Sequence, residues 1–211
     1  MKLKNKFRKY GGERIPNIIE YIKEYIEKYP TVNISIGCDS SEKRRAVVYA
    51  TTIVFYDYVT KNGAHVVFNR TSIPGKLDTF TRLYKEAEII HELAEYIDSE
   101  LSEFHVRNDI DDEQIRRYKL HLEQHKGNHI YVDGYDEEKL MNSFVITNKD
   151  RMIQYKICDV HLDYNISFGD GKFKSHQAFK AAVPWFKSSG YRVWCKPYSH
   201  ASTSAADILL K

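Results

Sequence analysis

Four acidic residues of this chain stand where a lone carboxylate would be costly to bury. Asp39 and Asp163 each end a stretch in which apolar and polar residues alternate, as in a strand. Glu86 lies inside the apolar stripe of a helical stretch, and Asp207 lies off the apolar side of the last helical stretch. A buried charge without a partner costs several kcal/mol, so each group needs a metal ion or a basic side chain. The chemistry to test first is therefore the binding of divalent metal ions by carboxylates.

The stretch 32–40 reads Val-Asn-Ile-Ser-Ile-Gly-Cys-Asp-Ser. Its apolar residues share one face, and its small or polar residues share the other, which ends in Asp39. Neighbours this small cannot cover the charge of Asp39, so we expect a divalent metal ion to be its partner. The stretch 155–164 repeats the pattern, with Asp159, His161 and Asp163 on one face.

Glu86 lies within a helix predicted from Thr79 to about Leu101, with Asp78 as its cap. The apolar stripe of this helix consists of Leu83, Ala87, Ile90, Leu93, Ala94, Ile97 and Leu101. Glu86 falls inside the stripe, whereas Glu88, Glu92 and Glu95 point away from it. Either Glu86 reaches solvent at the edge of the stripe, or a cation reached from the sheet holds it.

The elements that must position these acids follow from periodicity and from turn signals. An amphipathic helix is predicted over 16–29, and Asn62-Gly63 indicates a hairpin between two of the strands. A polar, charged segment at 105–150 resembles an insertion. The remaining expected elements are strands at 32–40, 45–58, 64–73, 155–164 and 191–195, and helices at 79–101, 175–188 and 201–210.

Length and composition are those of a chain that can bury a sizeable core. The sequence has 211 residues, of which 42% are hydrophobic. We expect a single domain over 1–211, comprising a basic arm and helix at 1–30 and the insertion at 105–150. No apolar run is long enough to span a membrane, and no secretory signal is evident, so we expect a soluble cytoplasmic protein with reduced, buried cysteines.

The charge of the chain is unevenly distributed, although its net value is only +3. Residues 1–9 contain five basic side chains and no acid, and residues 165–211 contain seven basic side chains against two acids. Basic ends suit contact with a polyanion such as nucleic acid, but they are equally compatible with ordinary solvated surface.

Three blocks of the sequence resemble signatures of the YkuK-type ribonuclease H-like family, a set of predicted nucleases. They are Ile36-Gly37-Cys38-Asp39-Ser40, His161-Leu162-Asp163-Tyr164-Asn165, and the run from Lys196 through Asp207. The resemblance covers 1–104 and 151–211. It implies an α/β fold of the ribonuclease H-like type, with a mixed five-stranded sheet of three antiparallel and then parallel strands, flanked by helices.

The resemblance also implies a function, because this fold would bring Asp39, Glu86, Asp163 and Asp207 together as catalytic metal ligands. An all-oxygen set favours Mg²⁺ or Mn²⁺. Two ions would act, with Asp39 bridging them, and hydrolysis of DNA or RNA would leave a 3′-hydroxyl and a 5′-phosphate. The alternative is a non-catalytic nucleic-acid-binding or interaction module that keeps the fold.

Residues near these acids are candidates for supporting roles. Ser40 and His161 would lie just behind the metal ligands; His161 could orient a water molecule or bind the metal, or it could be a packed histidine. The family match favours phosphate binding by Lys196, Ser199, His200 and Ser202, although the serines could equally be helix caps.

Two further possibilities arise in the polar segment. His121 and His125 are spaced as zinc ligands could be, but no third ligand is evident, and a surface helix explains the spacing equally well. Asp133 is a rival to Asp163 if the insertion lies elsewhere.

Overall fold

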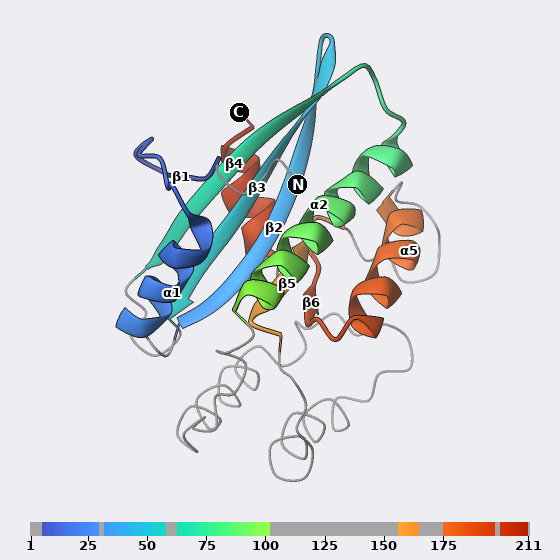
Figure 1. The fold of residues 1–211 in the computed structure, drawn as a ribbon. Helices are drawn as coiled ribbons and strands as arrows, with labels where there is room; N and C mark the ends of the chain where they lie inside the picture. Colours follow the sequence, from blue (N-terminus) through green and yellow to red (C-terminus); the bar gives the residue numbers. More distant parts are fainter. Residues whose placement is uncertain are drawn as a thin grey trace.

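The computed structural model describes residues 6–29, 32–57, 63–101, 156–164, 175–196 and 199–210. Its centre is a six-stranded mixed sheet in the order β1-β4-β3-β2-β5-β6 (Figure 1). The strands are β1 (Arg8–Lys9), β2 (Val32–Lys43), β3 (Ala46–Asp57), β4 (Ala64–Pro74), β5 (Cys158–Leu162) and β6 (Val193–Trp194).

The predicted order of three antiparallel strands followed by parallel strands is confirmed. β2 pairs with β3 and β3 with β4 in antiparallel fashion, whereas β5 is parallel to β2 and β6 is parallel to β5. The sheet has one strand more than predicted, because the two residues of β1 pair with β4. So short a strand leaves no alternating pattern in the sequence.

Helices cover both faces of the sheet (Figure 1). Helices α1 (Ile18–Lys28), α2 (Thr79–Glu100) and α5 (Ser175–Ser188) lie over the face that carries Ile34, Ile36 and Phe55. The short helix η2 (Ala201–Ala206) lies on the opposite face, where it forms a small apolar cluster with Ala50, Leu209 and Leu210.

Helix boundaries follow local chemistry. Asn17 caps α1 by accepting a hydrogen bond from the Ile19 N–H at 3.0 Å, so the helix begins at Ile18 and not at residue 16 as predicted. Asp78 caps α2 as predicted, accepting from the Thr81 N–H at 3.0 Å. Pro184 lies inside α5 without ending it.

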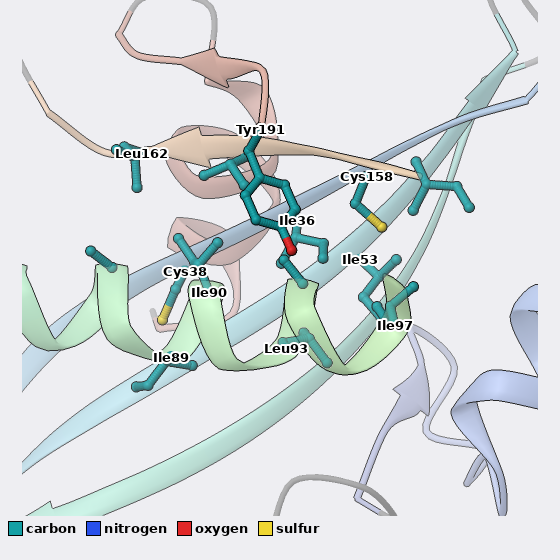
Figure 2. Packing of buried hydrophobic residues seen from close by; sticks show 14 of the residues in the cluster. Ile36, Cys38, Ile53, Ile89, Ile90, Leu93, Ile97, Cys158, Leu162 and Tyr191 are labelled. Carbon is teal, nitrogen blue, oxygen red and sulfur yellow. The ribbon is translucent and has the colours of Figure 1, made fainter. Parts of the chain in front are cut away.

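The main core lies between the sheet and α2. Figure 2 shows Ile90, Leu93 and Ile97 of α2 facing Ile36 of β2, with Cys158 and Leu162 of β5 beside them. The predicted apolar stripe of α2 is buried throughout. The cysteines at 38, 158 and 195 are free and buried, as predicted.

Four elements have bounds that differ from those that the sequence predicts. β2 continues through Asp39 to Lys43 because β3 pairs with it along its whole length, so Asp39 does not end the strand. β5 and β6 are shorter than expected. The last helix is a π-helix that ends at Ala206. The side chains of Ser202 and Thr203 donate to the Ser199 carbonyl oxygen, and such bonds compete with backbone hydrogen bonds and distort helices.

In the described part of the chain, no helix has both the length and the apolar character needed to cross a membrane.

Candidate active site

The strand register places Asp39 and Asp163 next to each other. The parallel pairing of β2 with β5 ends at Cys38 and Leu162, and the two aspartates are the residues that follow directly. Successive side chains alternate between faces, so both carboxylates lie on the face that η2 covers. Because β5 ends there while β2 continues, the two acids lie where the sheet loses a strand.

Asp39 has an altered proton equilibrium. Burial raises the pKa of its carboxyl group to about 6, and repulsion by Asp163 and Asp207 adds to this, against hydrogen bonding by Ser40 and the charge of Lys196. The Ser40 N–H donates to Asp39 Oδ1 at 2.7 Å. Asp39 therefore lies within electrostatic reach of two other candidate ligands.

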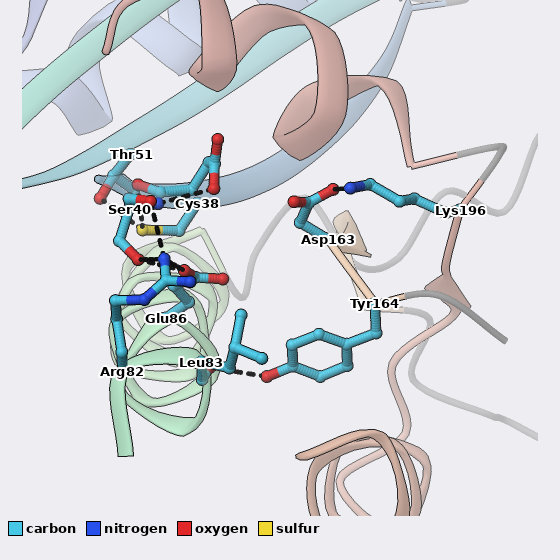
Figure 3. Close-up of polar contacts among 10 residues, drawn as sticks. Cys38, Ser40, Thr51, Arg82, Leu83, Glu86, Asp163, Tyr164 and Lys196 are labelled. Carbon is cyan, nitrogen blue, oxygen red and sulfur yellow. Dashed lines mark hydrogen bonds and ion pairs between the residues drawn. The ribbon is translucent and has the colours of Figure 1, made fainter. Parts of the chain in front are cut away.

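Glu86 reaches the same region from α2, on the other face of the sheet. Its side chain is buried, and Ser40 Oγ donates a short hydrogen bond to Glu86 Oε1 (Figure 3). Burial raises the pKa of Glu86 well above its ordinary value; the Ser40 hydrogen bond opposes this, while Asp39 and Asp163 add repulsion. Glu86 is buried and so does not reach solvent at the edge of the stripe; its partner from the sheet is the Ser40 hydroxyl, whereas a cation reached from the sheet stays a prediction.

Arg82 completes this arrangement. Its Nη1 atom donates to the Ser40 carbonyl oxygen at 2.7 Å and to Ser40 Oγ at 2.6 Å, and it lies 3.6 Å from Glu86 Oε1. The guanidinium group therefore supplies positive charge beside a buried carboxylate. Sequence reasoning missed Arg82, although its position four residues before Glu86 on one helix was a usable signal.

Tyr164 connects the end of β5 to the helix that carries Glu86. The ring is fully buried, and its hydroxyl donates to the Leu83 carbonyl oxygen at 2.7 Å (Figure 3). Leu83 precedes Glu86 by one helical turn, and Tyr164 follows Asp163 directly. This bond fixes the position of α2 relative to Asp163, the acid that follows β5.

Lys196 pairs with Asp163. The distance from Lys196 Nζ to Asp163 Oδ1 is 2.6 Å, and both side chains are only partly exposed (Figure 3). Its position follows from the sheet, because His161 pairs with Trp194 and the Lys196 N–H donates to the Tyr164 carbonyl oxygen at 3.2 Å. The predicted phosphate ligand thus contacts a predicted metal ligand.

Helix η2 is held tightly against the sheet, which positions Asp207. A Cβ atom on Gly37 would lie 2.4 Å from the Ala201 carbonyl carbon, so only glycine permits this approach. The peptide groups of Ala201 are fixed from both sides: Thr52 Oγ1 donates to its oxygen at 2.7 Å, and its N–H donates to His161 Nδ1 at 3.3 Å. Asp207 directly follows the last residue of η2 and interacts electrostatically with Asp39.

His161 is a packed histidine that positions η2. Burial lowers its pKa well below the ordinary value, and the nearby charges of His200 and Arg192 act in the same direction. Because Nδ1 accepts a hydrogen bond, the proton of the neutral ring lies on Nε2. The rings of His161 and His200 meet edge to face, 4.3 Å apart.

The other predicted phosphate ligands face different environments. Ser199 and Ser202 are fully buried, and the Ser202 hydroxyl donates to the Ser199 carbonyl oxygen at 3.0 Å. His200 is partly exposed at the start of η2. Phosphate binding by these residues stays a prediction. The Ser202 hydroxyl is engaged inward, and the Ser199 hydroxyl is buried without a hydrogen-bond partner among the described residues.

Some acids that the sequence did not single out are structural. Asp159 is buried and engages Arg192 at 2.6 Å, together with side-chain N–H groups of Asn33 and Trp194 at 3.1 Å. Asp98 is also buried and accepts from the Ile157 N–H at 3.1 Å. Each of these two acids forms an ion pair, Asp159 with Arg192 and Asp98 with Lys156.

The acidic side chains, as they stand, are not grouped around one metal position. Among the residues that the structure describes, no three His, Cys, Asp or Glu side chains are grouped so that they could hold a metal ion. Among the described residues, Glu86 Oε2 is buried without a hydrogen-bond partner, and the pKa of Asp39 is raised. The oxygen donors suit Mg²⁺ or Mn²⁺ in chemistry, but Asp39 and Glu86 approach from opposite faces of β2 and are not grouped around one point.

Several predicted features lie outside the described residues. These are the possible zinc ligands His121 and His125, the rival acid Asp133, most of the basic arm and the whole of the predicted insertion at 105–150.

Sheet order and the placement of the acids define an α/β protein with a nuclease-like fold. The family described as Ribonuclease H-like matches residues 17–125, which is more than half of the chain, and the protein belongs to this family. The matched region contains Asp39 and Glu86. It also includes residues 105–125 of the predicted insertion at 105–150, and it ends before Asp163. No curated protein matches the chain, and no solved structure matches it.

Proposed function

We propose that this protein is a metal-dependent nuclease that hydrolyses phosphodiester bonds of nucleic acid. Its Mg²⁺ or Mn²⁺ would be held by Asp39, Glu86, Asp163 and Asp207. The observation that carries the proposal is the strand register, which sets Asp39 and Asp163 side by side where β5 ends. Electrostatic coupling of Asp39 to both Asp163 and Asp207, and of Glu86 to Asp39, supports it. Membership of the ribonuclease H-like family supports a nuclease-like fold.

The chemistry divides between the ions and the chain. Divalent ions bound by carboxylates activate a water molecule and stabilise the leaving oxygen of a phosphodiester. Asp39 must lose its proton to act as a ligand, so metal binding should strengthen as the pH rises through about 6. Ser40 and Arg82 orient Glu86 toward β2, and His161 and Thr52 fix the helix that precedes Asp207.

Metal binding is the first test. A ligand that binds only the native state at one hundred times its Kd adds about 2.7 kcal/mol to stability, so Mn²⁺ or Mg²⁺ should raise the melting temperature of the wild type. We expect Asp39→Asn to lose this response. The matched control is Asp78→Asn, which also converts a carboxylate to an amide but at an exposed helix cap where asparagine serves equally well. An unchanged response in Asp39→Asn would place the metal elsewhere.

Cleavage is the second test. Labelled DNA, RNA and hybrid duplexes are incubated with the protein and Mn²⁺, with Asp163→Asn as the inactive control. Activity that persists in Asp163→Asn would point to a contaminant or to another site.

The second candidate function is a non-catalytic nucleic-acid-binding module. The ion pair between Lys196 and Asp163 favours it, because a basic side chain already neutralises one of the acids. Binding of labelled oligonucleotides without cleavage, and without any metal-dependent rise in stability, would support this alternative.

A further inference from the structure

The hairpin between β2 and β3 extends beyond the end of β5 (Figure 1). β2 pairs with β5 only as far as Cys38, whereas β2 and β3 stay paired up to Lys43 and Ala46. β4 follows β3 to the same point. At about 3.3 Å per residue, the turn at Arg44 lies about 16 Å from Asp39 along β2. A three-stranded extension of the sheet therefore begins at the candidate site.

The tip of this extension is basic. Lys43, Arg44 and Arg45 follow one another in the hairpin, and Lys76 follows the residue whose N–H donates to the Arg45 carbonyl oxygen at 3.0 Å. All four side chains are exposed, and among the described residues none of them forms an ion pair, although Glu42 is also exposed nearby. These four side chains form the basic tip, whose positive charge is open to solvent.

The two arginines of the tip occupy a turn that favours other residues. Hairpin turns of two residues favour Asn-Gly or glycine, because their backbone dihedral angles suit residues without a bulky side chain. Arg44 and Arg45 fill both positions here, between the paired residues Lys43 and Ala46. Within the described part of the chain, neither side chain forms a hydrogen bond or an ion pair that would hold the turn. Turn stability therefore does not account for the two arginines, whereas binding of an anionic partner does.

The basic tip has a fixed place relative to the candidate site. Asp39, Ser41 and Lys43 alternate along β2 and share the face that η2 covers. The ammonium group of Lys43 donates to the Leu210 carbonyl oxygen at 3.1 Å, which ties the hairpin to the segment that follows η2. Phosphates on one strand of a duplex recur roughly every 3.4 Å along its axis, so the tip lies within about five phosphates of a phosphodiester at Asp39.

We propose that the basic tip binds the phosphate backbone of a nucleic acid whose reacting phosphodiester lies at Asp39. This inference rests on the proposed function for its partner, and it assigns one side of the path: the nucleic acid leaves the site along the β2–β3 hairpin. Arg44 and Arg45 supply most of the contact, because Lys43 is already bonded to the chain. Guanidinium groups bind phosphate oxygens through paired N–H donors, independently of base sequence. No metal ion takes part in this contact.

Binding of nucleic acid in EDTA tests the inference without cleavage. Fluorescence anisotropy of labelled duplex DNA, single-stranded DNA and RNA is recorded for the full chain at several salt concentrations. Each phosphate contact adds about 0.9 to the slope of log Kobs against log salt for a duplex, and about 0.7 for a single strand. Replacing both arginines, Arg44→Gln and Arg45→Gln, should therefore reduce the slope by about 1.8 or about 1.4, and binding should weaken most at low salt.

Three further double variants separate charge from folding. Arg44→Asn with Arg45→Gly installs the preferred turn residues, so it should melt at the wild-type temperature or higher and bind as weakly as the glutamine variant. Arg44→Lys with Arg45→Lys keeps the charge and should keep the slope. The matched control is Arg8→Gln with Arg14→Gln, which changes a second pair of neighbouring exposed arginines, at the β1 edge of the sheet. The control should leave the slope unchanged.

The outcomes separate this inference from the function on which it rests. A wild-type slope in the glutamine variant, or an equal fall in the Arg8 and Arg14 control, would overturn the inference and leave a nuclease standing. Vesicles of phosphatidylserine and phosphatidylcholine that bind through the two arginines, with an unchanged nucleic-acid slope, would overturn it in favour of a membrane surface. A reduced slope in a protein that cleaves nothing would support the inference and contradict the nuclease. No binding of any nucleic acid by the wild type would overturn both proposals.

Discussion

Ser40 links two acids that approach the site from opposite faces of β2. Its N–H binds Asp39, its hydroxyl binds Glu86, and its carbonyl and hydroxyl oxygens both accept from Arg82. One residue therefore couples the charge on the sheet to the charge on α2. Because the Glu86 carboxylate is buried, removing it from water costs free energy, and the hydrogen bond from Ser40 and the charge of Arg82 offset that cost.

Replacing Arg82 by methionine should destabilise the protein. The change removes two hydrogen bonds to Ser40 and the nearby positive charge, and we expect a loss of about 2 kcal/mol in the free energy of unfolding. Urea denaturation in EDTA measures it. Lys85→Met, on the exposed side of the same helix turn, should change stability by less than about 0.5 kcal/mol.

A double variant sharpens this test. If Arg82 matters because it faces a charge, the loss should be smaller in a Glu86→Gln background than in the wild type. Equal losses in the two backgrounds would show that Arg82 stabilises only the backbone of Ser40.

Asp39 makes the stability of the metal-free protein depend on pH. Its pKa in the folded chain is about 6, against an ordinary value of 3.8, so the folded state binds the proton more tightly than the unfolded state. The contribution of Asp39 is therefore greatest below pH 3.8 and is lost as the pH rises through 6. A shift of about two units corresponds to a loss of up to about 3 kcal/mol.

Denaturation of the wild type and Asp39→Asn in EDTA, from about pH 4.5 to 7.5, measures this effect. Stability of the wild type should fall relative to Asp39→Asn across that range. Asp78 is the control: hydrogen bonds from Thr81 lower its pKa below 3.8, so its contribution is constant across this range, and Asp78→Asn should run parallel to the wild type. Parallel curves for the wild type and Asp39→Asn would contradict the raised pKa.

At the scale of elements, η2 owes its position to contacts with β3 and β5 and to the absence of a side chain on Gly37. Thr52→Val removes the hydroxyl that donates to the Ala201 carbonyl oxygen at 2.7 Å and leaves that oxygen buried without this donor. We expect a loss of about 1–3 kcal/mol, with faster amide exchange across η2.

Thr51→Val is the matched control for this change. Thr51 is equally buried on the preceding position of β3, but it faces α2, and its hydroxyl makes a long contact with Cys38 Sγ at 3.7 Å. Its replacement should cost less than that of Thr52 and should leave exchange across η2 unchanged. Equal effects of both variants would mean that the Thr52 hydroxyl does not hold η2.

Elements with strong periodicity could be predicted from the sequence, and those set by contacts could not. The stripe of α2 and the cap at Asp78 led to bounds within one residue of those observed. By contrast, η2 depends on side-chain bonds to the Ser199 carbonyl and on the glycine beneath it, and neither leaves a periodic signal. A strand was predicted at 191–195, but β6 spans only Val193–Trp194, the two residues that pair with β5, and no local pattern sets those bounds.

The same distinction applies to the site. Burial of Glu86 could be predicted because it interrupts an apolar stripe, and the adjacency of Asp39 and Asp163 could be expected once the strand order was inferred. The ion pair of Lys196 with Asp163 could not, since it depends on a register between β5 and β6 that the sequence does not fix.

At the scale of the whole molecule, the sheet and its helices form a continuous core although residues 102–155 separate α2 from β5 in the sequence. Asp98 of α2 connects the two elements: it accepts a hydrogen bond from the Ile157 N–H at 3.1 Å and forms an ion pair with Lys156 Nζ at 3.0 Å. The last turn of α2 and the start of β5 are therefore held together directly. The chain leaves the core and returns to it at neighbouring points.

This geometry leads to a prediction for the whole chain. Replacing 102–155 by a flexible Gly/Ser linker of about eight residues should leave a folded protein, because the shorter connection lowers the entropy lost on closing the loop by about 1–2 kcal/mol. We expect one cooperative unfolding transition and the same response to Mn²⁺ as in the full chain, since Asp39, Glu86, Asp163 and Asp207 all remain. Combining the deletion with Asp98→Ala should destabilise it far more than Asp98→Asn does, because the amide oxygen still accepts from Ile157. A deletion variant that fails to unfold cooperatively would show that 102–155 contributes to the core, in keeping with the extension of the family match to residue 125.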